Sequence, residues 1–503
     1  MPSRSRPYVA AKDDIVWRKL EEFSDQWNKS LHNADLYRAV ARLILKYKDG
    51  DGVELKKWKG GYNVVYRLEY KDGSSVMMRV PMKDLVPFPY EKIRYEVATM
   101  RYVAANTTIP VPHIYHCGTA AENPTGLGPF IIMDYIEHDY NMSRVLLDPT
   151  LPPDQSPILD PNINEEKLEY IYAQMANVLL QLSTLKFPRI GSLEEEEDGK
   201  TISVKGRPLT WNMNDIIVHT NAPKSILPEP SRTYATEDEW LNALADMHMV
   251  QISFQHNDAA EDEDDARDKY VSRQLFRNLV KEKRLFPRAS SKPDDRFRLF
   301  SEDFRPANVL LDKDLKIVGV IDWEFAYAAP ARFIYDPPWW LLIERAEHWS
   351  GGYDAWMEIY EPRFQTFLRM LEAEEKKMAD ANLAEKVNSL TLTDNDNNND
   401  NKEMMEIPLS QRMRESWEKR TWMISSAATK SWNLDYLWWH YLDEDFFGPN
   451  EDHDHKIRVE LLSEPQKKVM ESFVARKIED GKDGEKVNFG DEDPPDLVNE
   501  FLV

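Results

Sequence analysis

The segment 301–324 constrains this chain more than any other part of its sequence. Residues 301–312 read Ser-Glu-Asp-Phe-Arg-Pro-Ala-Asn-Val-Leu-Leu-Asp, and residues 317–324 read Ile-Val-Gly-Val-Ile-Asp-Trp-Glu. Two short apolar runs, the second rich in β-branched residues, flank an Asp-Lys-Asp turn, and this pattern predicts a hairpin. The hairpin would bring Asn308 at one end close in space to Asp322 at the other.

Asp303, Asn308 and Asp322 have the residue types and the spacing that phosphoryl transfer needs. One carboxylate receives the proton of an attacking hydroxyl, while an Asn and a second carboxylate hold magnesium ions on the phosphate oxygens. We therefore predict Asp303 as the catalytic residue and Asn308 and Asp322 as magnesium ligands. The alternative is that Asp303 and Asn308 only cap a turn, as Asp and Asn often do. The joint spacing with the hairpin favours the site.

This segment resembles the aminoglycoside phosphotransferase and choline kinase branch of the protein-kinase-like superfamily, and more narrowly its large fungal set. The family loop reads His-x-Asp-x-x-x-x-Asn and is followed by an Ile-Asp-Trp-Glu-type segment. Here Ser301 replaces the family His, which is mainly a scaffold residue, and Glu302 precedes the Asp where a small residue is more usual. The resemblance covers most of the chain from about residue 58 to residue 448.

The resemblance implies a bilobal, protein-kinase-like α+β fold with a small β-rich N-terminal lobe and a large, mainly helical C-terminal lobe. The small lobe would comprise residues 1–133 with a helical N-terminal extension, and the large lobe residues 134–503. An Asn- and Asp-rich insertion at about 380–404 would be disordered. The implied activity is transfer of the γ-phosphoryl group of ATP to a hydroxyl of a small molecule, with ATP and Mg²⁺ as cofactors.

A glycine pair marks the predicted phosphate loop. Gly60 and Gly61 precede a β-branched alternating run, and a Lys-Asp-Gly turn then leads to a second strand. Glycines in such a turn let backbone N–H groups approach phosphates closely, although paired glycines also occur in ordinary turns. By resemblance, Gly60, Gly61 and Asn63 belong to the loop over the ATP phosphates. Arg79 on the next strand stands where kinases generally carry a Lys for the α- and β-phosphates.

The amphipathic segment 90–103 predicts a helix with its apolar residues on one side. In the family, an acid on this helix pairs with the phosphate-binding cation of the preceding strand. We expect Glu96 to be the partner of Arg79, with Glu91 as the alternative.

The strand-like segment 128–137 ends in a polar step. By resemblance it is the hinge between the lobes, where main-chain groups would meet the edge of the adenine. Met133 and Tyr135 are the residues that we assign to this nucleotide contact.

The charge of the chain limits its partners. Lys and Arg number 64 against 88 Asp and Glu, which gives a net charge of −24. This argues against a general nucleic-acid binder, because neutralising phosphates needs clustered cations. Acidic character suits a cationic acceptor through steering. Many of the acids, however, lie in the runs 194–198 and 261–265, which have the composition of solvated loops.

The cysteine content and the hydropathy suggest a location. The single cysteine, Cys117, excludes an intramolecular disulfide framework and suits a reducing compartment. No apolar stretch is long enough to span a bilayer, and no signal-peptide core follows Met1. We therefore expect a cytoplasmic protein without a membrane partner. The sequence leaves its oligomeric state open.

Two other functions stay open. A catalytically inactive kinase-like binding or scaffold protein would explain both departures from the family, Ser301 for His and Arg79 for Lys. A protein kinase is disfavoured, because no Ser/Thr-rich activation segment and no Ala-Pro-Glu ending follow Asp322. For a small acceptor, helices before the catalytic loop would form one wall of its pocket. The acids 258–265 would either line that wall or form an exposed loop.

Overall fold

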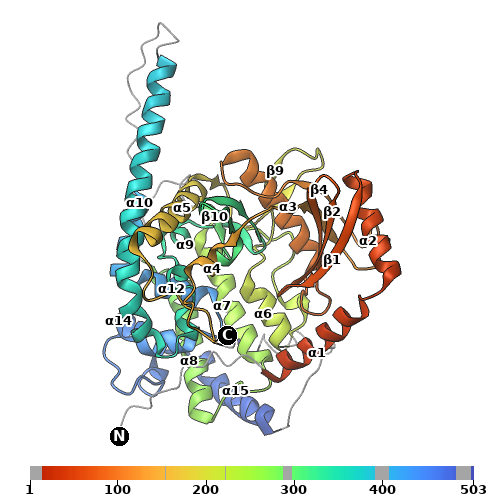
Figure 1. Ribbon diagram of the computed structural model, residues 1–503. Helices are drawn as coiled ribbons and strands as arrows, with labels where there is room; N and C mark the ends of the chain where they lie inside the picture. The colour runs from red at the N-terminus through yellow and green to blue at the C-terminus, as the bar shows by residue number, and fades with distance from the viewer. Residues whose placement is uncertain are drawn as a thin grey trace.

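A computed structural model describes most of the chain. The described residues are 14–152, 155–220, 222–286, 297–390, 407–482 and 500–502. The N-terminal part carries the largest sheet found in these residues, and the part that follows is mainly helical (Figure 1). This confirms the predicted α+β fold with a small β-rich lobe and a large helical lobe. The exact boundary at residue 133 stays a prediction.

The small lobe is built on a five-stranded antiparallel sheet with the strand order β1-β2-β3-β5-β4. Burial alternates along β2, as expected for a strand with one face in the core. The register sets Arg79 opposite Val65 on one side and Ile131 on the other. The strands are β1 (Gly52–Lys59), β2 (Asn63–Tyr70), β3 (Ser75–Pro81), β4 (Ile114–Gly118) and β5 (Phe130–Asp134).

Two helices precede the sheet, α1 (Asp14–Ser30) and α2 (Ala34–Tyr47). α2 packs its apolar face on the sheet, and α1 reaches the large lobe, where Trp17 stacks on His219 with ring centroids 5.3 Å apart. α2 is capped by the side chain of Asn33, which accepts a hydrogen bond from the backbone N–H of Asp35 at 2.8 Å.

The helix α3 (Pro89–Asn106) connects β3 to β4 and begins with a proline in its first turn, a position that suits the fixed φ of proline. Lys92 and Glu96 lie one turn apart on it and are both buried. Lys92 and Glu96 therefore lie on the side of α3 that faces the interior between the lobes.

The large lobe follows from Tyr135 onward. Its strands are β6 (Tyr140–Asn141), β7 (Lys186–Phe187), β8 (Ser192–Glu195), β9 (Ile202–Gly206), β10 (Phe297–Ser301), β11 (Val309–Leu311), β12 (Ile317–Val320) and β13 (Ala326–Pro330). Its α-helices are α4 (Met142–Leu146), α5 (Glu165–Thr184), α6 (Trp211–Thr220), α7 (Glu237–Phe254), α8 (Glu263–Lys281), α9 (Ala331–Tyr335), α10 (Gly352–Leu390), α11 (Leu409–Glu418), α12 (Thr421–Thr429), α13 (Leu434–Leu437), α14 (Asp443–Phe447) and α15 (Glu464–Lys482). Shorter helical turns are η1 (Lys224–Ile226), η3 (Pro306–Asn308), η4 (Trp339–Leu342), η5 (Ala346–His348), η6 (Trp438–Leu442) and η7 (Val459–Leu461).

The predicted hairpin is present. β11 and β12 pair antiparallel with Val309 opposite Val320, and the backbone N–H of Ile321 donates to the carbonyl of Asn308 at 2.9 Å. β10 pairs with β13, which places Ser301 opposite Ala326. These two pairings hold both ends of the segment 301–324 in one place.

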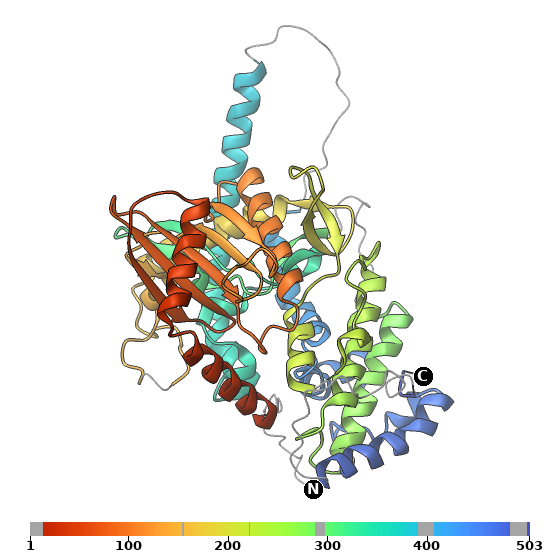
Figure 2. The same cartoon turned by 90° about the vertical axis from the view of Figure 1, so that its right-hand side faces the viewer.

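The C-terminal helices enlarge the core of the large lobe. Figure 2 shows α7 and α8 side by side, with α15 packed against α8. The aromatic run after α13 is core, since Trp438 and Trp439 are fully buried. α10 projects from the body of the protein (Figure 1) and stays helical to Leu390, so residues 380–390 of the expected insertion are helix. The remainder of that insertion, 391–404, lies outside the described residues.

Within the described ranges, the structure contains no helix of the length and apolar character that crossing a membrane would require.

The capping role of Asn33 in α2 can be tested by substitution. Asn33→Ala removes a side chain that satisfies a first-turn N–H, and we expect it to lower the local stability of α2 by about 1 kcal/mol. Arg38→Ala is the matched control, because it removes only an exposed pair with Asp35, a change of at most a few tenths of a kcal/mol. Hydrogen exchange of the α2 amides measures both. Equal losses for the two variants would contradict the assignment.

Candidate active site

Asp303 lies in the loop between β10 and η3 and is 7% exposed. The side-chain amide of Asn308 donates to the Oδ2 of Asp303 at 2.9 Å and to its backbone carbonyl at 2.8 Å. Arg305 places its Nε 2.9 Å from Oδ1 of the same carboxyl group. Burial raises the pKa of Asp303 to about 6, although Arg305 and Asn308 act in the opposite direction. The group is therefore mainly ionised at neutral pH.

Asp322 follows β12 in a strained backbone conformation. Its φ is 60°, a left-handed value that residues other than glycine rarely adopt and that occurs preferentially at functional sites. Its Oδ1 lies 2.6 Å from Nη1 of Arg79 on β3. Burial and the nearby Glu324 raise the pKa of Asp322, against the effect of Arg79. The large lobe thus presents this carboxylate directly to the small lobe.

Arg79 is buried and also forms an ion pair with Glu96 of α3. The structure therefore brings together the pair that the sequence analysis preferred. The alternative acid, Glu91, is engaged elsewhere, because Arg207 donates two hydrogen bonds of 2.8 Å to its carboxylate. One guanidinium consequently joins Glu96 of the small lobe to Asp322 of the large lobe.

A second buried cation stands beside Arg79, and the sequence analysis missed it. Lys92 is 2% exposed, donates to Oδ1 of Asn63 at 2.8 Å and forms an ion pair with Glu324, which is 4% exposed. Burial lowers the pKa of Lys92. Burial alone would raise the pKa of Glu324, but Lys92 and Arg79 outweigh it and lower that pKa. The sequence signal available for Lys92 itself was its spacing from Glu96, one turn away on α3.

The glycine turn lies between β1 and β2. The N–H of Gly60 donates to the carbonyl of Asn63 at 2.8 Å, and a Cβ atom added at Gly61 would meet no other atom within 4 Å. No other protein atom therefore fills the space beside Gly61. The next residue, Tyr62, packs edge-on against Trp211 of α6 and Phe325, with ring centroids 6.4 and 6.2 Å apart. This cluster anchors the turn to the large lobe.

The predicted hinge residues lie at the end of β5. Met133 is buried and pairs with Met77 of β3 and Ile114 of β4. The N–H of Tyr135 donates to the carbonyl of Ser75 at 3.2 Å, so this donor already has a partner inside the small lobe. The Tyr135 ring lies under the guanidinium of Arg67, 3.7 Å from its centroid. Both residues therefore lie at the junction of the lobes, but the backbone N–H of Tyr135 is already bonded within the small lobe.

The oxygen atoms of this site suit a hard cation. Asn308 turns its amide nitrogen toward Asp303, and its Oδ1 makes no hydrogen bond within the described residues. An amide oxygen and the Asp322 carboxylate are oxygen ligands of the kind that Mg²⁺ takes together with water and phosphate. No group of three or more His, Cys, Asp or Glu side chains in the described part of the chain could hold a metal ion by itself. The residues present fit a magnesium ion that is shared with a phosphate ligand.

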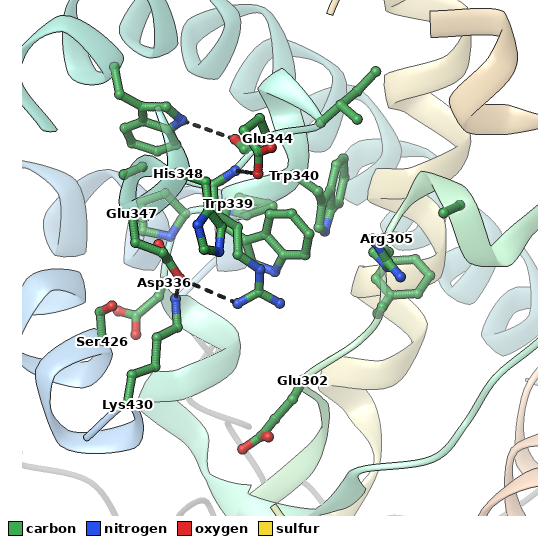
Figure 3. A pocket seen from close by; sticks show the side chains of 18 of the residues that line it. Glu302, Arg305, Asp336, Trp339, Trp340, Glu344, Glu347, His348, Ser426 and Lys430 are labelled. Atoms are coloured by element: carbon green, nitrogen blue, oxygen red, sulfur yellow. Dashed lines mark hydrogen bonds and ion pairs between the residues drawn. The ribbon is translucent and has the colours of Figure 1, made fainter. Parts of the chain in front are cut away.

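A cavity of about 990 Å³ opens beside the catalytic loop (Figure 3). Glu302 and Arg305 border it on the side of that loop, and Lys430 and Glu347 lie on the other side. The backbone N–H of Trp211 donates to Oε2 of Glu302 at 2.6 Å. Burial raises the pKa of Glu302 to about 7. The neighbouring carboxyl groups of Glu302 and Asp303 thus lie in different environments.

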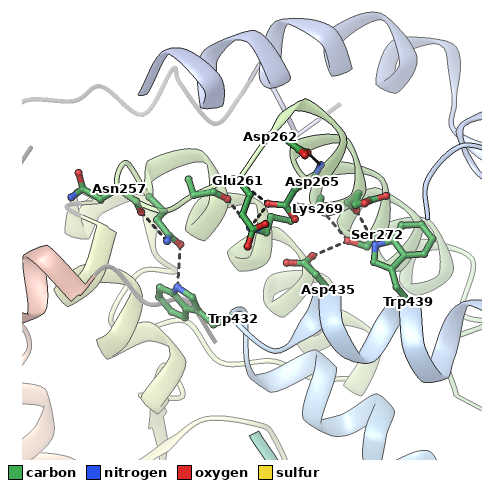
Figure 4. A network of polar contacts seen from close by, with 12 residues as sticks. Asn257, Glu261, Asp262, Asp265, Lys269, Ser272, Trp432, Asp435 and Trp439 are labelled. Atoms are coloured by element: carbon green, nitrogen blue, oxygen red, sulfur yellow. Dashed lines mark hydrogen bonds and ion pairs between the residues drawn. The ribbon is translucent and has the colours of Figure 1, made fainter. Parts of the chain in front are cut away.

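Helices before the catalytic loop contribute to the cavity wall through residues of α4, α5 and α6, but none of the described residues that line it comes from α7 or α8. The acids 258–265 lie elsewhere, around the start of α8 (Figure 4). Asp262 caps α8 by accepting from the N–H of Asp265 at 2.8 Å, and the Asp265 carboxylate pairs with Lys269 at 2.8 Å. These acids have a local structural role.

The Lys92–Glu324 pair generates a stability prediction. We expect Lys92→Met to lower the free energy of unfolding by about 3–5 kcal/mol, because it leaves the Glu324 carboxylate buried without its cation. The double variant Lys92→Met/Glu324→Leu should recover much of that loss. Urea denaturation followed by tryptophan fluorescence measures both. Lys419→Met, which breaks an exposed pair with Glu415, is the control and should change stability by less than about 0.5 kcal/mol. A small loss for Lys92→Met would contradict the pairing.

Curated relatives and solved structures similar to this chain are known. A subtelomeric hrmA-associated cluster protein of Aspergillus fumigatus is 29% identical over 140 residues, which are 28% of this chain and 24% of that protein. Altered inheritance of mitochondria protein 9 of Kluyveromyces lactis is 28% identical over 145 residues, 28% of this chain and 22% of the relative. The chain thus spans about a quarter of the length of these relatives. The solved ethanolamine kinase of Plasmodium vivax is 12% identical with a TM-score of 0.40, covering 90% of this chain and 93% of that one.

The expected cytoplasmic location is wrong in the light of these relatives. The proteins from Kluyveromyces lactis, Komagataella phaffii and Saccharomyces cerevisiae that match this chain are named as mitochondrial. A single cysteine does not distinguish one reducing compartment from another, which is why composition misled the prediction.

The family follows from a match over a longer part of the chain. Residues 54–368 match the model of one family, and this range contains the glycine turn, α3, the catalytic loop and the hairpin. The matched range is more than half of the 503 residues. The chain therefore belongs to the Phosphotransferase enzyme family.

Proposed function

We propose that this protein transfers the γ-phosphoryl group of ATP, in a magnesium-dependent reaction, to a hydroxyl group of a small molecule. The observation that carries the proposal is the pair of contacts that four side chains from the two lobes make. Asn308 contacts Asp303 at 2.9 Å, and Arg79 of the small lobe contacts Asp322 at 2.6 Å. Membership of the Phosphotransferase enzyme family supports the reaction class.

Each residue has a role in this proposal. Asp303 orients the acceptor hydroxyl and takes its proton, for which a carboxylate that is ionised at neutral pH is suited. Asn308 and Asp322 would hold magnesium, which supplies positive charge to the phosphate oxygens when it is bound. Arg79, held by Glu96, would bind the α- and β-phosphates as a guanidinium fork.

The nucleotide would lie between the lobes. The turn at Gly60 and Gly61 would cover the phosphates, with Asn63 fixed behind it by Lys92. The main chain near Met133 and Tyr135 would receive the adenine. The acceptor would enter the cavity beside Glu302, since this cavity borders the loop that carries Asp303.

One observation favours a second candidate, a catalytically inactive binding protein. The Arg79 guanidinium lies directly on Asp322, the carboxylate proposed for magnesium, and Ser301 replaces the family His. In that case ATP would bind without magnesium dependence or not at all, and no phosphorylated product would form. Labelling of peptides by the protein would instead support a protein kinase.

Substitution of the proposed base tests the reaction. We expect Asp303→Asn to lower the rate of phosphoryl transfer by about 10²–10⁴-fold, because a neutral amide cannot accept the hydroxyl proton. The measurement is ADP and phosphorylated product formed from Mg-ATP with a panel of small hydroxyl compounds. Asp314→Asn, in the exposed hairpin turn, is the control and should match the wild type. Full activity of Asp303→Asn, or no product with any acceptor, would contradict the proposal.

A mitochondrial location is part of the same proposal, on the basis of the names of the yeast relatives. Fractionation of cells that express the native protein should recover it with mitochondria. Recovery in the cytosolic fraction alone would exclude this location.

A further inference from the structure

The cavity beside the catalytic loop is lined by many aromatic side chains. Indole rings reach it from α6, η4, α10, α11 and α12, among them Trp211, Trp339 and Trp356. A volume of about 990 Å³ is at the upper end of the range for drug-sized ligands. Such a wall favours a compound with apolar rings over a compact polyamine.

Arg345 is fixed within this wall. Its guanidinium carbon lies 3.9 Å from the ring centroid of Trp339 and 5.0 Å from that of Trp211. The side chain is 16% exposed, and its Nη2 atom is buried without a hydrogen-bond partner in the described part of the protein. A buried cationic donor without a partner is costly, so a group that accepts from it would be strongly favoured. Stacking between two indoles holds the guanidinium plane in one orientation.

The acid beside Arg345 does not neutralise it fully. Glu347 lies 3.6 Å from Nη1 of Arg345 and also forms an ion pair with Lys430 (Figure 3). Burial acts to raise the pKa of Glu347, but Lys430 and Arg345 outweigh it and lower that pKa to about 2. Two cations therefore share the Glu347 carboxylate, and Glu302 is a second acid that interacts electrostatically with both of them.

The other carboxyl groups of the wall are already engaged. Asp336 accepts from the hydroxyl of Ser416 at 2.6 Å, Glu344 accepts from the backbone N–H of Arg345 at 2.8 Å, and Asp215 also has a partner. Glu302 accepts from the backbone N–H of Trp211, and its second oxygen has no partner. With a pKa of about 7, Glu302 carries only part of a negative charge at neutral pH. The open donor of Arg345 belongs to a cationic group and the open oxygen of Glu302 to a group that is only partly charged, which favours an anion at Arg345.

We infer that the cavity binds a hydroxyl compound that contains apolar rings and carries an anionic oxygen group, either a carboxylate or a phosphate. This anionic group lies on the guanidinium of Arg345. That this compound is the phosphoryl acceptor rests on the function proposed above. A planar fork of donors matches the two oxygens of such a group. The aromatic wall would cover its rings, and its hydroxyl would point toward the catalytic loop. Arg345 is then the residue that selects anionic acceptors.

Three matched probes test the charge preference. 2-Naphthoate, 2-naphthylmethanol and 2-naphthylmethylammonium share one ring system and differ in charge. Calorimetric titration of the full chain, without nucleotide, should give the tightest binding for 2-naphthoate. Tighter binding of the ammonium probe, or no binding of 2-naphthoate at millimolar concentration, would overturn the inference.

Substitutions of Arg345 locate the binding. Arg345→Met keeps an unbranched stem, and Lys430 still neutralises Glu347, so the fold should persist. We expect 2-naphthoate to bind at least 10-fold more weakly to this variant while the neutral probe changes less than 3-fold. Arg345→Lys should recover part of the loss and serves as the test if Arg345→Met does not fold. Arg284→Met is the control, because Arg284 is exposed and pairs with Glu282 outside the cavity. Unchanged 2-naphthoate affinity in the Arg345 variants would overturn the assignment.

Failure of this inference is distinguishable from failure of the proposed function. If 2-naphthoate binds at Arg345 but no acceptor is phosphorylated, the site stands and the phosphotransferase proposal fails. If phosphoryl transfer occurs only with cationic acceptors, the function stands and the anion site fails.

Discussion

The contact of Arg79 with both Glu96 and Asp322 is the interaction on which the geometry of the site depends. It places a buried guanidinium of β3 between an acid of α3 and the carboxylate that follows β12. Lys92 repeats the arrangement one turn earlier on α3, with Glu324 and Asn63 as its partners. Buried charges are tolerated only when they are paired, so these contacts fix how the small lobe lies on the hairpin of β11 and β12.

Aromatic packing adds a second connection between the lobes. Trp211 stacks on Phe325 at a centroid distance of 6.0 Å and receives the edge of Tyr62 from the glycine turn. The same Trp211 ring faces Arg345 in the cavity. Trp211 therefore contacts both the proposed nucleotide loop and the proposed acceptor cavity.

Sequence patterns predicted the local parts of this structure and failed where distant segments meet. The hairpin after Asn308 follows from short apolar runs, which a sequence displays directly, and the pairing of Arg79 with Glu96 was expected from the family resemblance. The pair between Lys92 and Glu324 joins positions far apart in the chain, and no local pattern marks it. The cavity wall likewise combines segments that lie far apart in the chain, from α4, α5 and α6 before the loop to η4, α10, α11 and α12 after it.

The most direct test of the account is calorimetric binding of ATP with and without magnesium to the wild type and to Asp322→Ala. We expect ATP to bind more tightly when magnesium is present, because Asp322 and Asn308 would hold the ion and its positive charge would favour the phosphates. We also expect Asp322→Ala to remove this magnesium effect while the fold persists. ATP binding that is independent of magnesium, or no binding to the wild type, would mean that the Arg79 contact closes the site, and would contradict the account.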